Sequence, residues 1–177
     1  MKQKIKKLSV LLIAFSLYTA ANAQQNTVGL SIGFGKDYNY YKGSDVRPTL
    51  IAHYDRNEIV SFGNWGSLSA GIMYGYKSAK HKINDFETEW KYNIIGVRPA
   101  LHFNIDKNKK FDVYAGSFLG MRFLNFRDNT ELANNNKSTF TAGYFAGGSY
   151  KFTKNLSVFA EAGNDISNLR TGIQFHF

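Results

Sequence analysis

The last nine residues of the chain alternate, position by position, between apolar side chains and polar or small ones. The segment 169–177 reads Leu-Arg-Thr-Gly-Ile-Gln-Phe-His-Phe. A period of two is the repeat of a β-strand, because successive side chains of a strand point to opposite faces of the sheet. The chain therefore has to place this strand in a sheet with one apolar face and one polar face.

The same pattern recurs along the chain and predicts eight strands. In the first of them, four apolar residues alternate with glycine and serine over residues 28–35. Elsewhere too, one face is apolar and the other is mostly glycine, serine and threonine. The predicted strands cover residues 27–35, 45–54, 66–76, 91–104, 111–123, 138–152, 156–164 and 169–177. The predicted fold is all-β, an eight-stranded antiparallel up-and-down barrel.

The first 23 residues have the pattern of a secretory signal peptide. Four lysines lie within residues 1–7, an apolar run follows from Leu8 to Tyr18, and Ala21 and Ala23 supply the small residues of a cleavage site. The apolar run is too short and too interrupted for a membrane-spanning helix. We expect cleavage after Ala23, which divides the chain into a signal peptide (1–23) and one barrel domain (24–177).

Composition narrows the function classes further. Removing the signal takes away four of the 22 basic residues and none of the 13 acidic ones, so the formal charge falls from +9 to +5. Such a moderate charge does not favour a nucleic-acid partner. The chain has no cysteine, which excludes a disulfide scaffold, and no long apolar run follows the signal. Any membrane span in the mature chain must therefore be made of strands.

Periodicity alone does not say which face of the barrel points outward. In a soluble barrel the apolar face is inside, and in a membrane barrel it is outside. The polar faces carry few lysines, charged residues cluster in the connections around 77–89, 106–110 and 127–137, and the aromatic Phe177 lies on the apolar face. These features favour a transmembrane barrel. A soluble, lipocalin-like periplasmic carrier of a lipophilic ligand is the alternative.

Long connections are predicted at residues 36–44, 77–90 and 124–137, on the side away from the termini. The connection 55–65 is long on the opposite side, and it can hide a strand extension because residues 59–62 alternate too. The charges of the 77–89 segment fit either contact with lipopolysaccharide phosphates or a solvated loop. Several aromatic residues near these connections fit an outer membrane girdle or a sugar-binding surface: Tyr38, Tyr40, Tyr41, Tyr76, Trp90 and Tyr92.

A set of charged residues lies on the faces predicted to point inward. Glu161 is the only carboxylate clearly assigned to the interior, so we expect it to pair with one or more of Arg98, Arg122 and Arg170. An eight-stranded barrel is just filled by its side chains. The set therefore predicts either a structural plug of ion pairs or a narrow path that favours anions. Its members are Arg47, Arg98, Arg122, Glu161 and Arg170.

No pattern in the sequence predicts catalysis, a metal site or a cofactor site. The glycine pairs at 33–35 and 147–148 lie inside predicted strands, with no turn into a helix that could hold a phosphate. The four histidines lie in separate segments, and the pair His81 and Asp85 lies in a charged connection. We expect a protein that is not an enzyme.

The cleavable signal, the alternating strands and the ending Ile173, Phe175 and Phe177 together resemble the small outer-membrane β-barrel proteins of the OmpA/OmpX-like group. The resemblance implies a monomeric barrel in the outer membrane, surrounded by lipid and lipopolysaccharide. It also implies that Ile173, Phe175 and Phe177 form the signal for the barrel-assembly machinery. Such barrels include adhesins, small pores, anchors and a few enzymes, so one activity is not implied. A structural or surface-interaction role is the first hypothesis, and a narrow pore for small solutes, anionic ones included, is the second.

Overall fold

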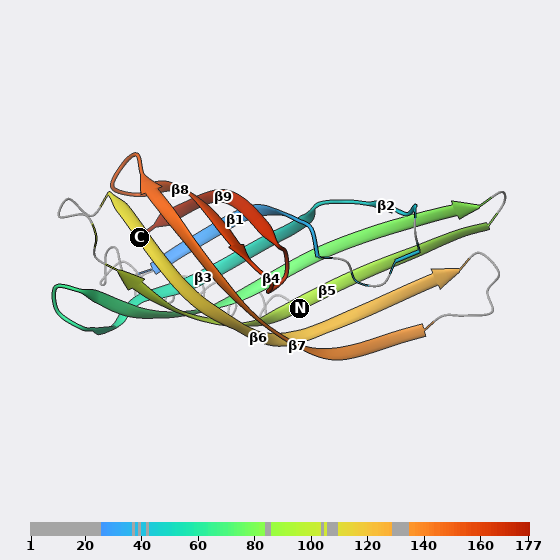
Figure 1. Cartoon of the computed structure of the whole chain (residues 1–177), viewed down its shortest axis with the longest axis horizontal. Helices are drawn as coiled ribbons and strands as arrows, with labels where there is room; N and C mark the ends of the chain where they lie inside the picture. Colours follow the sequence, from blue (N-terminus) through green and yellow to red (C-terminus); the bar gives the residue numbers. More distant parts are fainter. Residues whose placement is uncertain are drawn as a thin grey trace, which may run out of the picture.

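Eight antiparallel strands form a closed ring in a computed structural model of the chain (Figure 1). The structure describes residues 26–36, 38, 40, 41, 43–83, 86–103, 105, 110–128 and 135–177. The predicted signal peptide (1–23) and its cleavage site lie outside the described residues. The ring consists of β1 (Asn26–Phe34), β3 (Thr49–Ser61), β4 (Gly66–Ile83), β5 (Phe86–Phe103), β6 (Phe111–Asp128), β7 (Asn135–Lys151), β8 (Leu156–Gly163) and β9 (Leu169–His176).

Each ring strand pairs with its neighbours in sequence order, and β9 closes the ring on β1. In the closing pair, Val28 lies opposite Phe175 and Leu30 lies opposite Ile173. A short additional strand, β2 (Asp45–Val46), pairs with β4 beyond the end of β3. The predicted all-β, eight-stranded up-and-down barrel is confirmed, since each predicted strand overlaps one strand of the ring.

The connection predicted at residues 55–65 is mostly strand. β3 runs on to Ser61 after an irregularity in its pairing between Arg56 and Val60, where Glu58 has a positive φ of 51°. β4 then begins at Gly66, so only a tight turn joins the two strands. The suspected strand extension is confirmed, and the prediction of a long connection on this side is wrong.

Two of the other predicted connections are also largely strand. β4, β5 and β6 contain 18 residues each and β7 contains 17, so they continue well past the ends of their neighbours. We call the end of the barrel that holds Asn26 and Phe177 the terminal end, and the opposite one the distal end. The projecting parts of β4 to β7 (77–83, 86–92, 122–128 and 135–143) form the distal extension, at the right of Figure 1. The prediction missed most of it because many of its outward residues are charged or polar, although the alternation continues.

The apolar faces of the strands point outward. Leu30, Ile72 and Ile173 are 59%, 58% and 54% exposed, whereas the inward Ser69 and Glu161 are 1% and 2% exposed. A continuous apolar surface of this kind is unstable in water and stable in lipid. The soluble carrier required the opposite arrangement, which is not the one found.

The outward apolar surface has the height of a membrane core. On β6 the outward row runs from Phe111 to Phe123. At roughly 3.3 Å per residue and a tilt of about 40°, this row is about 30 Å tall, close to the hydrocarbon thickness of a bilayer. No helix among the described residues is long and apolar enough to cross a membrane.

Candidate functional site

Glu161 on β8 lies at the centre of the barrel interior and binds side chains from three other strands. Its Oε1 accepts hydrogen bonds from Arg98 Nη2 on β5 at 2.9 Å and from Tyr114 Oη on β6 at 2.8 Å. Its Oε2 accepts hydrogen bonds from Nε and Nη2 of Arg170, which lies opposite Glu161 in the β8–β9 register. All four side chains are buried. The network therefore links distant walls of the barrel.

Two more carboxylates complete this network, although the sequence analysis identified only Glu161 as clearly inward. Asp55 Oδ2 accepts a hydrogen bond from Arg98 Nη1 at 2.7 Å, and Asp165 Oδ2 lies 3.3 Å from Arg170 Nη1. Asp55 continues the period-two pattern of β3, so extending that strand would have found it. Asp165 belongs to the β8–β9 connection, which folds into the lumen and has no periodic signal.

Two of the five residues predicted for the charge network lie outside it. The guanidinium of Arg122 lies over the rings of Tyr38 and Tyr92, with its Cζ 4.7 and 5.7 Å from their centroids. Arg47 is exposed beside β4, and its placement in the lumen is wrong. The reason is Pro48, which lacks an N–H for the sheet ladder and separates β2 from β3.

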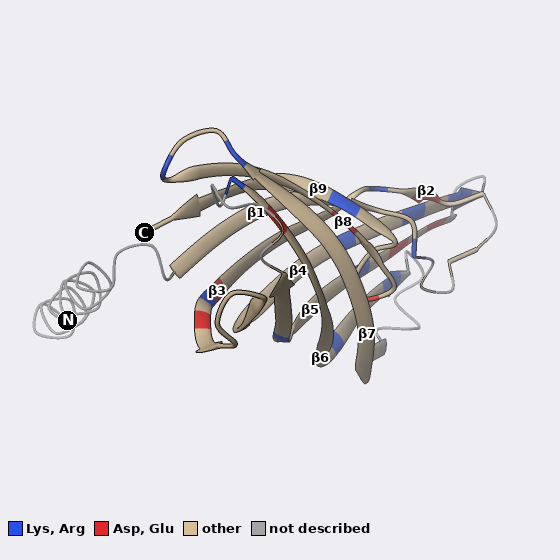
Figure 2. Cartoon of the chain, turned by 60° about the vertical axis from the view of Figure 1, so that its left-hand side comes forward, with Lys and Arg blue, Asp and Glu red and all other residues tan. Residues whose placement is uncertain are grey.

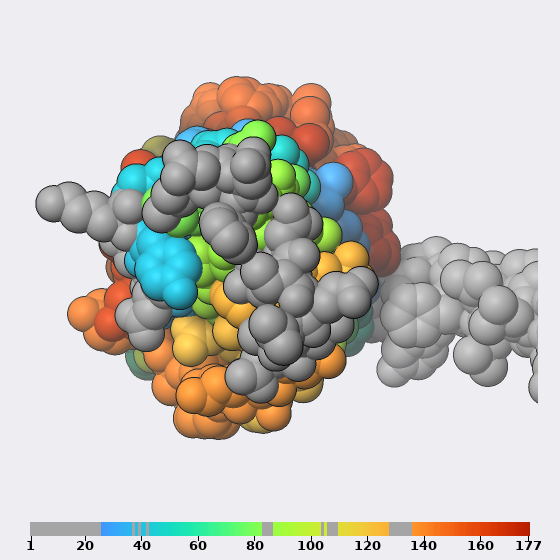
Figure 3. Space-filling model, turned by 90° about the vertical axis from the view of Figure 1, so that its right-hand side faces the viewer, coloured from blue at the N-terminus to red at the C-terminus, as the bar shows by residue number. Residues whose placement is uncertain are grey.

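Connections fold over the distal mouth of the barrel. Lys77 Nζ donates hydrogen bonds to the carbonyl oxygens of Gly35 and Lys36, at 2.8 and 2.7 Å. Tyr38 Oη donates to the carbonyl oxygen of Ile166 at 2.7 Å. In Figure 3, which faces this end, the cyan segment before β3 lies against the green β4–β5 hairpin.

Apolar side chains fill the interior between this cover and the ion network. Phe118 and Ile166 have no exposed surface, and Met73 and Ile94 are 1% exposed. The interior is therefore packed with side chains at two successive levels. This packing is what an eight-stranded barrel is expected to have.

Most of the aromatic residues assigned to an outer membrane girdle form a cluster on the inner side of the distal extension. Tyr38, Trp90 and Tyr92 are buried. The ring centroids of Tyr38 and Tyr92 are 5.1 Å apart, and those of Tyr40 and Trp90 are 5.9 Å apart. The girdle assignment of these residues is wrong because the register places them on the inward rows of β5 and of the connection that covers it.

The distal extension carries charged residues of both signs (Figure 2). Lys80 Nζ lies 2.7 Å from Glu87 Oε1, and Lys91 Nζ lies 2.7 Å from Glu89 Oε2. The hydrogen bond between Lys80 and Glu87 raises the pKa of the lysine and lowers the pKa of the carboxyl. Asp85, considered with His81 in the sequence analysis, lies outside the described residues.

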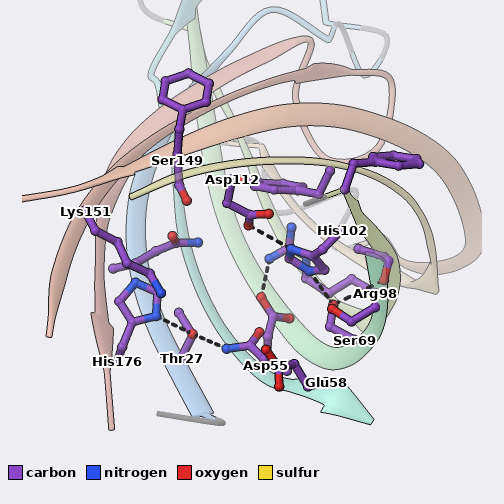
Figure 4. Close-up of a pocket in the computed structure, with 17 residues that line it drawn as sticks. Thr27, Asp55, Glu58, Ser69, Arg98, His102, Asp112, Ser149, Lys151 and His176 are labelled. Carbon is purple, nitrogen blue, oxygen red and sulfur yellow. Dashed lines mark hydrogen bonds and ion pairs between the residues drawn. The ribbon is translucent and has the colours of Figure 1, made fainter. Parts of the chain in front are cut away.

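A pocket of about 110 Å³ lies inside the barrel at the terminal end (Figure 4). Its walls are polar, with contributions from Asp55, Arg98, Lys151 and His176. His102 accepts or donates through both ring nitrogens: Nδ1 is 2.8 Å from Asp112 Oδ2, and Nε2 is 2.9 Å from Ser69 Oγ. Within the described residues, no group of three His, Cys, Asp or Glu side chains is placed to hold a metal ion.

The three C-terminal residues assigned to barrel assembly lie on the outward row of β9 and just after it. Ile173 and Phe175 are exposed, and the rings of Phe175 and Phe177 stack with their centroids 6.1 Å apart. The backbone of Phe177 is paired with Asn26, so the end of the chain is held in the sheet.

Comparison with known proteins finds similar structures but no similar sequences. No family model matches the sequence, and no curated protein matches it. A de novo designed transmembrane β-barrel is similar with a TM-score of 0.54 and 14% identity, covering 88% of this chain and 97% of the other. Ail, the attachment invasion locus protein of Yersinia pestis, in complex with the heparin analogue sucrose octasulfate, is similar with a TM-score of 0.50 and 14% identity, covering 84% and 91%. At this identity the likeness shows the fold alone.

Proposed function

We propose that this chain, which has the fold of the small eight-stranded outer-membrane β-barrels, acts through surface interactions at the distal end of a closed barrel. The observation that carries the proposal is the contrast between the two halves of the molecule. The interior is filled by Phe118, Ile94 and the Glu161 network, whereas the distal extension projects past the apolar belt with mostly polar side chains on its outer face. In such barrels the longer connections face the outside of the cell, which supports an outward-facing distal extension in this chain.

A narrow pore is the alternative. Three arginines of the predicted anion path lie in the interior, Arg98, Arg122 and Arg170. Arg98 and Arg170 are paired with carboxylates, and Arg122 lies against the rings of Tyr38 and Tyr92. Recordings from the purified barrel in planar bilayers test this alternative. We expect no stepwise conductance, and reproducible single-channel steps that depend on Arg98 would favour the pore.

The belt of outward apolar residues supports contact with outer-membrane lipids. It includes an open apolar hollow of about 760 Å³ across β1, β3, β4, β8 and β9, lined by residues such as Leu30, Leu50 and Ile173. Acyl chains fit such a surface, because most of its side chains are apolar and the hydroxyls of Tyr74 and Thr171 already donate hydrogen bonds within the protein. The barrel would sit in this environment as a monomer.

The distal extension and its neighbouring segment suit an anionic carbohydrate, such as the phosphorylated sugars of lipopolysaccharide. Arg47, Lys82, Arg127 and Lys137 are exposed there. Exposed cations attract anionic groups with an affinity that falls as salt screens the charges. The similarity in fold to Ail, whose structure contains a sulfated sugar analogue, is consistent with this class of ligand.

This interaction can be tested by titrating the refolded barrel with lipopolysaccharide at several salt concentrations. Replacing Arg47, Lys82 and Arg127 together by alanine should weaken binding at low salt. Lys154→Ala, which removes an exposed lysine at the terminal end, is the matched control. Equal binding by the triple variant and the control would contradict the proposed surface.

Export and assembly are the remaining parts of the proposal. Cleavage after Ala23 would produce a mature chain that begins at Gln24, which the intact mass of the purified protein measures. Ile173, Phe175 and Phe177 would be recognised by the barrel-assembly machinery as the final strand. The outward orientation of Ile173 and Phe175 supports this role, because the side chains are accessible from outside the ring.

A further inference from the structure

The terminal-end pocket contains a hydrogen-bonded series of a carboxylate, an imidazole and a hydroxyl. Asp112 on β6, His102 on β5 and Ser69 on β4 come from three adjacent strands, and their side chains all point inward. Asp112 Oδ2 is 2.8 Å from His102 Nδ1, and His102 Nε2 is 2.9 Å from Ser69 Oγ (Figure 4). These are the contacts that a serine nucleophile, its general base and the carboxylate that orients the base make in hydrolases.

The order of the contacts fits those roles. With its proton on Nδ1, His102 donates to Asp112 and leaves Nε2 free to accept the proton of the Ser69 hydroxyl. The carboxylate then stabilises the imidazolium that forms when this proton is transferred. Asp112 and His102 have side chains that are 31% and 19% exposed, so the base is in contact with the pocket.

The pocket also offers a donor for a developing negative charge. Ser69 pairs with Ala100 in the β4–β5 ladder, and a candidate donor among the side chains lies in the same pocket wall. Arg98 is buried and lines the same pocket, and in the part of the chain that the structure describes its Nε has no hydrogen-bond partner. Arg98 and His102 lie on the inward row of β5, on either side of Ala100, the residue opposite Ser69.

A second histidine near this end of the barrel provides an internal comparison. His176 Nε2 is 2.8 Å from Ser157 Oγ, but its Nδ1 is 3.0 Å from the hydroxyl of Thr27 rather than from a carboxylate. Both histidines therefore hold a serine, and only His102 also has an orienting carboxylate. At His176, hydroxyl groups alone provide hydrogen-bond partners for both ring nitrogens, so a buried imidazole in this barrel does not require a carboxylate.

We propose that Ser69, His102 and Asp112 form a catalytic triad that hydrolyses a short-chain carboxylic ester entering from the terminal end. A cavity of about 150 Å³ holds benzene, so a pocket of about 110 Å³ suits a short acyl group. The alcohol part of the ester would remain toward the mouth of the barrel. This activity is separate from the proposed distal interactions and does not depend on them.

The reaction balances with water as the only co-substrate. Ser69 Oγ bonds to the carbonyl carbon while its proton moves to His102 Nε2, and Arg98 Nε–H donates to the carbonyl oxygen as that atom becomes negative. The bond to the alkoxide then breaks, and the alkoxide takes the proton from His102. Water attacks the acyl-serine by the same route, with His102 as base, and releases the carboxylic acid and Ser69.

The test uses the full mature chain, folded in detergent, with p-nitrophenyl acetate as substrate and a fluorophosphonate as covalent probe. We expect saturable hydrolysis by the chain without substitutions. We also expect a phosphonyl group on Ser69 of this chain, located by mass spectrometry. Ser69→Ala should abolish both, and Asp112→Asn should reduce hydrolysis by about 10⁴-fold. Arg98→Lys should reduce hydrolysis by about 10²- to 10³-fold.

Ser157→Ala is the matched control, because it removes a serine hydroxyl from the other histidine and should leave hydrolysis unchanged. The different gel mobility of unheated and boiled barrels shows which variants are folded. Two results would overturn the proposal: a folded protein that neither hydrolyses the ester above the blank nor carries the probe on Ser69, or equal hydrolysis by Ser69→Ala. The labelling of the unmodified chain decides the question even if a variant does not fold.

Discussion

Glu161→Gln is expected to destabilise the barrel strongly, although it changes neither the length nor the shape of the side chain. The carboxylate accepts four hydrogen bonds from three residues, Arg98, Tyr114 and Arg170. The amide of glutamine has one oxygen, which can still serve Arg98 and Tyr114. Its NH₂ group would then face Arg170, so a donor would be opposed to a donor.

The size of the effect follows from what Arg170 retains. Its remaining carboxylate neighbour is Asp165, whose Oδ2 lies 3.3 Å from Nη1, while the contacts of Nε and Nη2 with Glu161 are lost. Breaking one partner out of a buried ion pair costs about 3–5 kcal/mol, since the other charge stays buried without full compensation. We therefore expect the free energy of unfolding to fall by about 3–5 kcal/mol.

Urea unfolding of the barrel refolded into phospholipid vesicles measures this change. Glu87→Gln is the matched control, because its carboxylate is exposed on the distal extension and pairs with Lys80 in solvent. We expect no measurable change there. A loss of less than about 1 kcal/mol for Glu161→Gln, which is the size of a surface ion pair, would refute the view that the network holds the barrel together.

Two substitutions and one deletion test the membrane placement, the packing and the assembly signal. Leu30→Arg should lower the free energy of unfolding by about 2–4 kcal/mol, because the side chain of residue 30 points into the bilayer. Asn125→Arg, which is also outward but on the distal extension, should change this free energy little. Equal losses for the two variants in vesicle unfolding would contradict the assigned membrane boundary. Gly29→Ala should lower the free energy of unfolding by about 1–3 kcal/mol, because a Cβ at residue 29 would lie 2.1 Å from the His53 ring. An unchanged urea midpoint would show instead that His53 can move aside. Removing Phe177 should reduce the amount of folded barrel in outer-membrane fractions without preventing folding in detergent, and normal assembly in cells would argue against the proposed signal.

The number of strands and the residues that share a face could be predicted because both depend on local alternation. The outward direction of the apolar faces was predicted from other features, namely the positions of the charged residues and of Phe177. Val28 to Phe34 on β1 and Leu169 to Phe177 at the end of the chain each show the pattern without reference to any other segment. The same rule also placed Arg98, Glu161 and Arg170 on inward rows. Ion pairs among these residues could then be predicted as well, because charges inside a narrow barrel need partners.

The distal extension could not be predicted from the same rule. Its outward residues, such as Lys80 and Lys82, leave the membrane, so they lose the apolar character by which the strands were recognised. The inward residues Trp90 and Tyr92 keep their place only because the connection containing Tyr38 covers them. That cover is a tertiary contact, which no local pattern contains.

The Ser69–His102–Asp112 cluster was missed for a different reason. The three residues are separated by 33 and 10 positions along the chain and meet only through the registers of β4 with β5 and of β5 with β6. A shift of either register by one residue would turn one side chain to the lipid. Register follows from the turns and from the whole ring, so a single sequence does not fix it.

The distal extension also restores something that barrel closure removes, an open sheet edge. β8 pairs with β7 only as far as Phe145, opposite Gly163, so in the described part of the chain residues 135–143 of β7 have a strand neighbour on the β6 side alone. An unpaired edge exposes N–H and C=O groups that can accept an extra strand. Here the edge begins with Asn136, Lys137 and Ser138, polar residues of the kind that discourage unwanted pairing. Any added strand would therefore have to pair through the backbone of β7 alone, without apolar side chains to support it at the start of this edge.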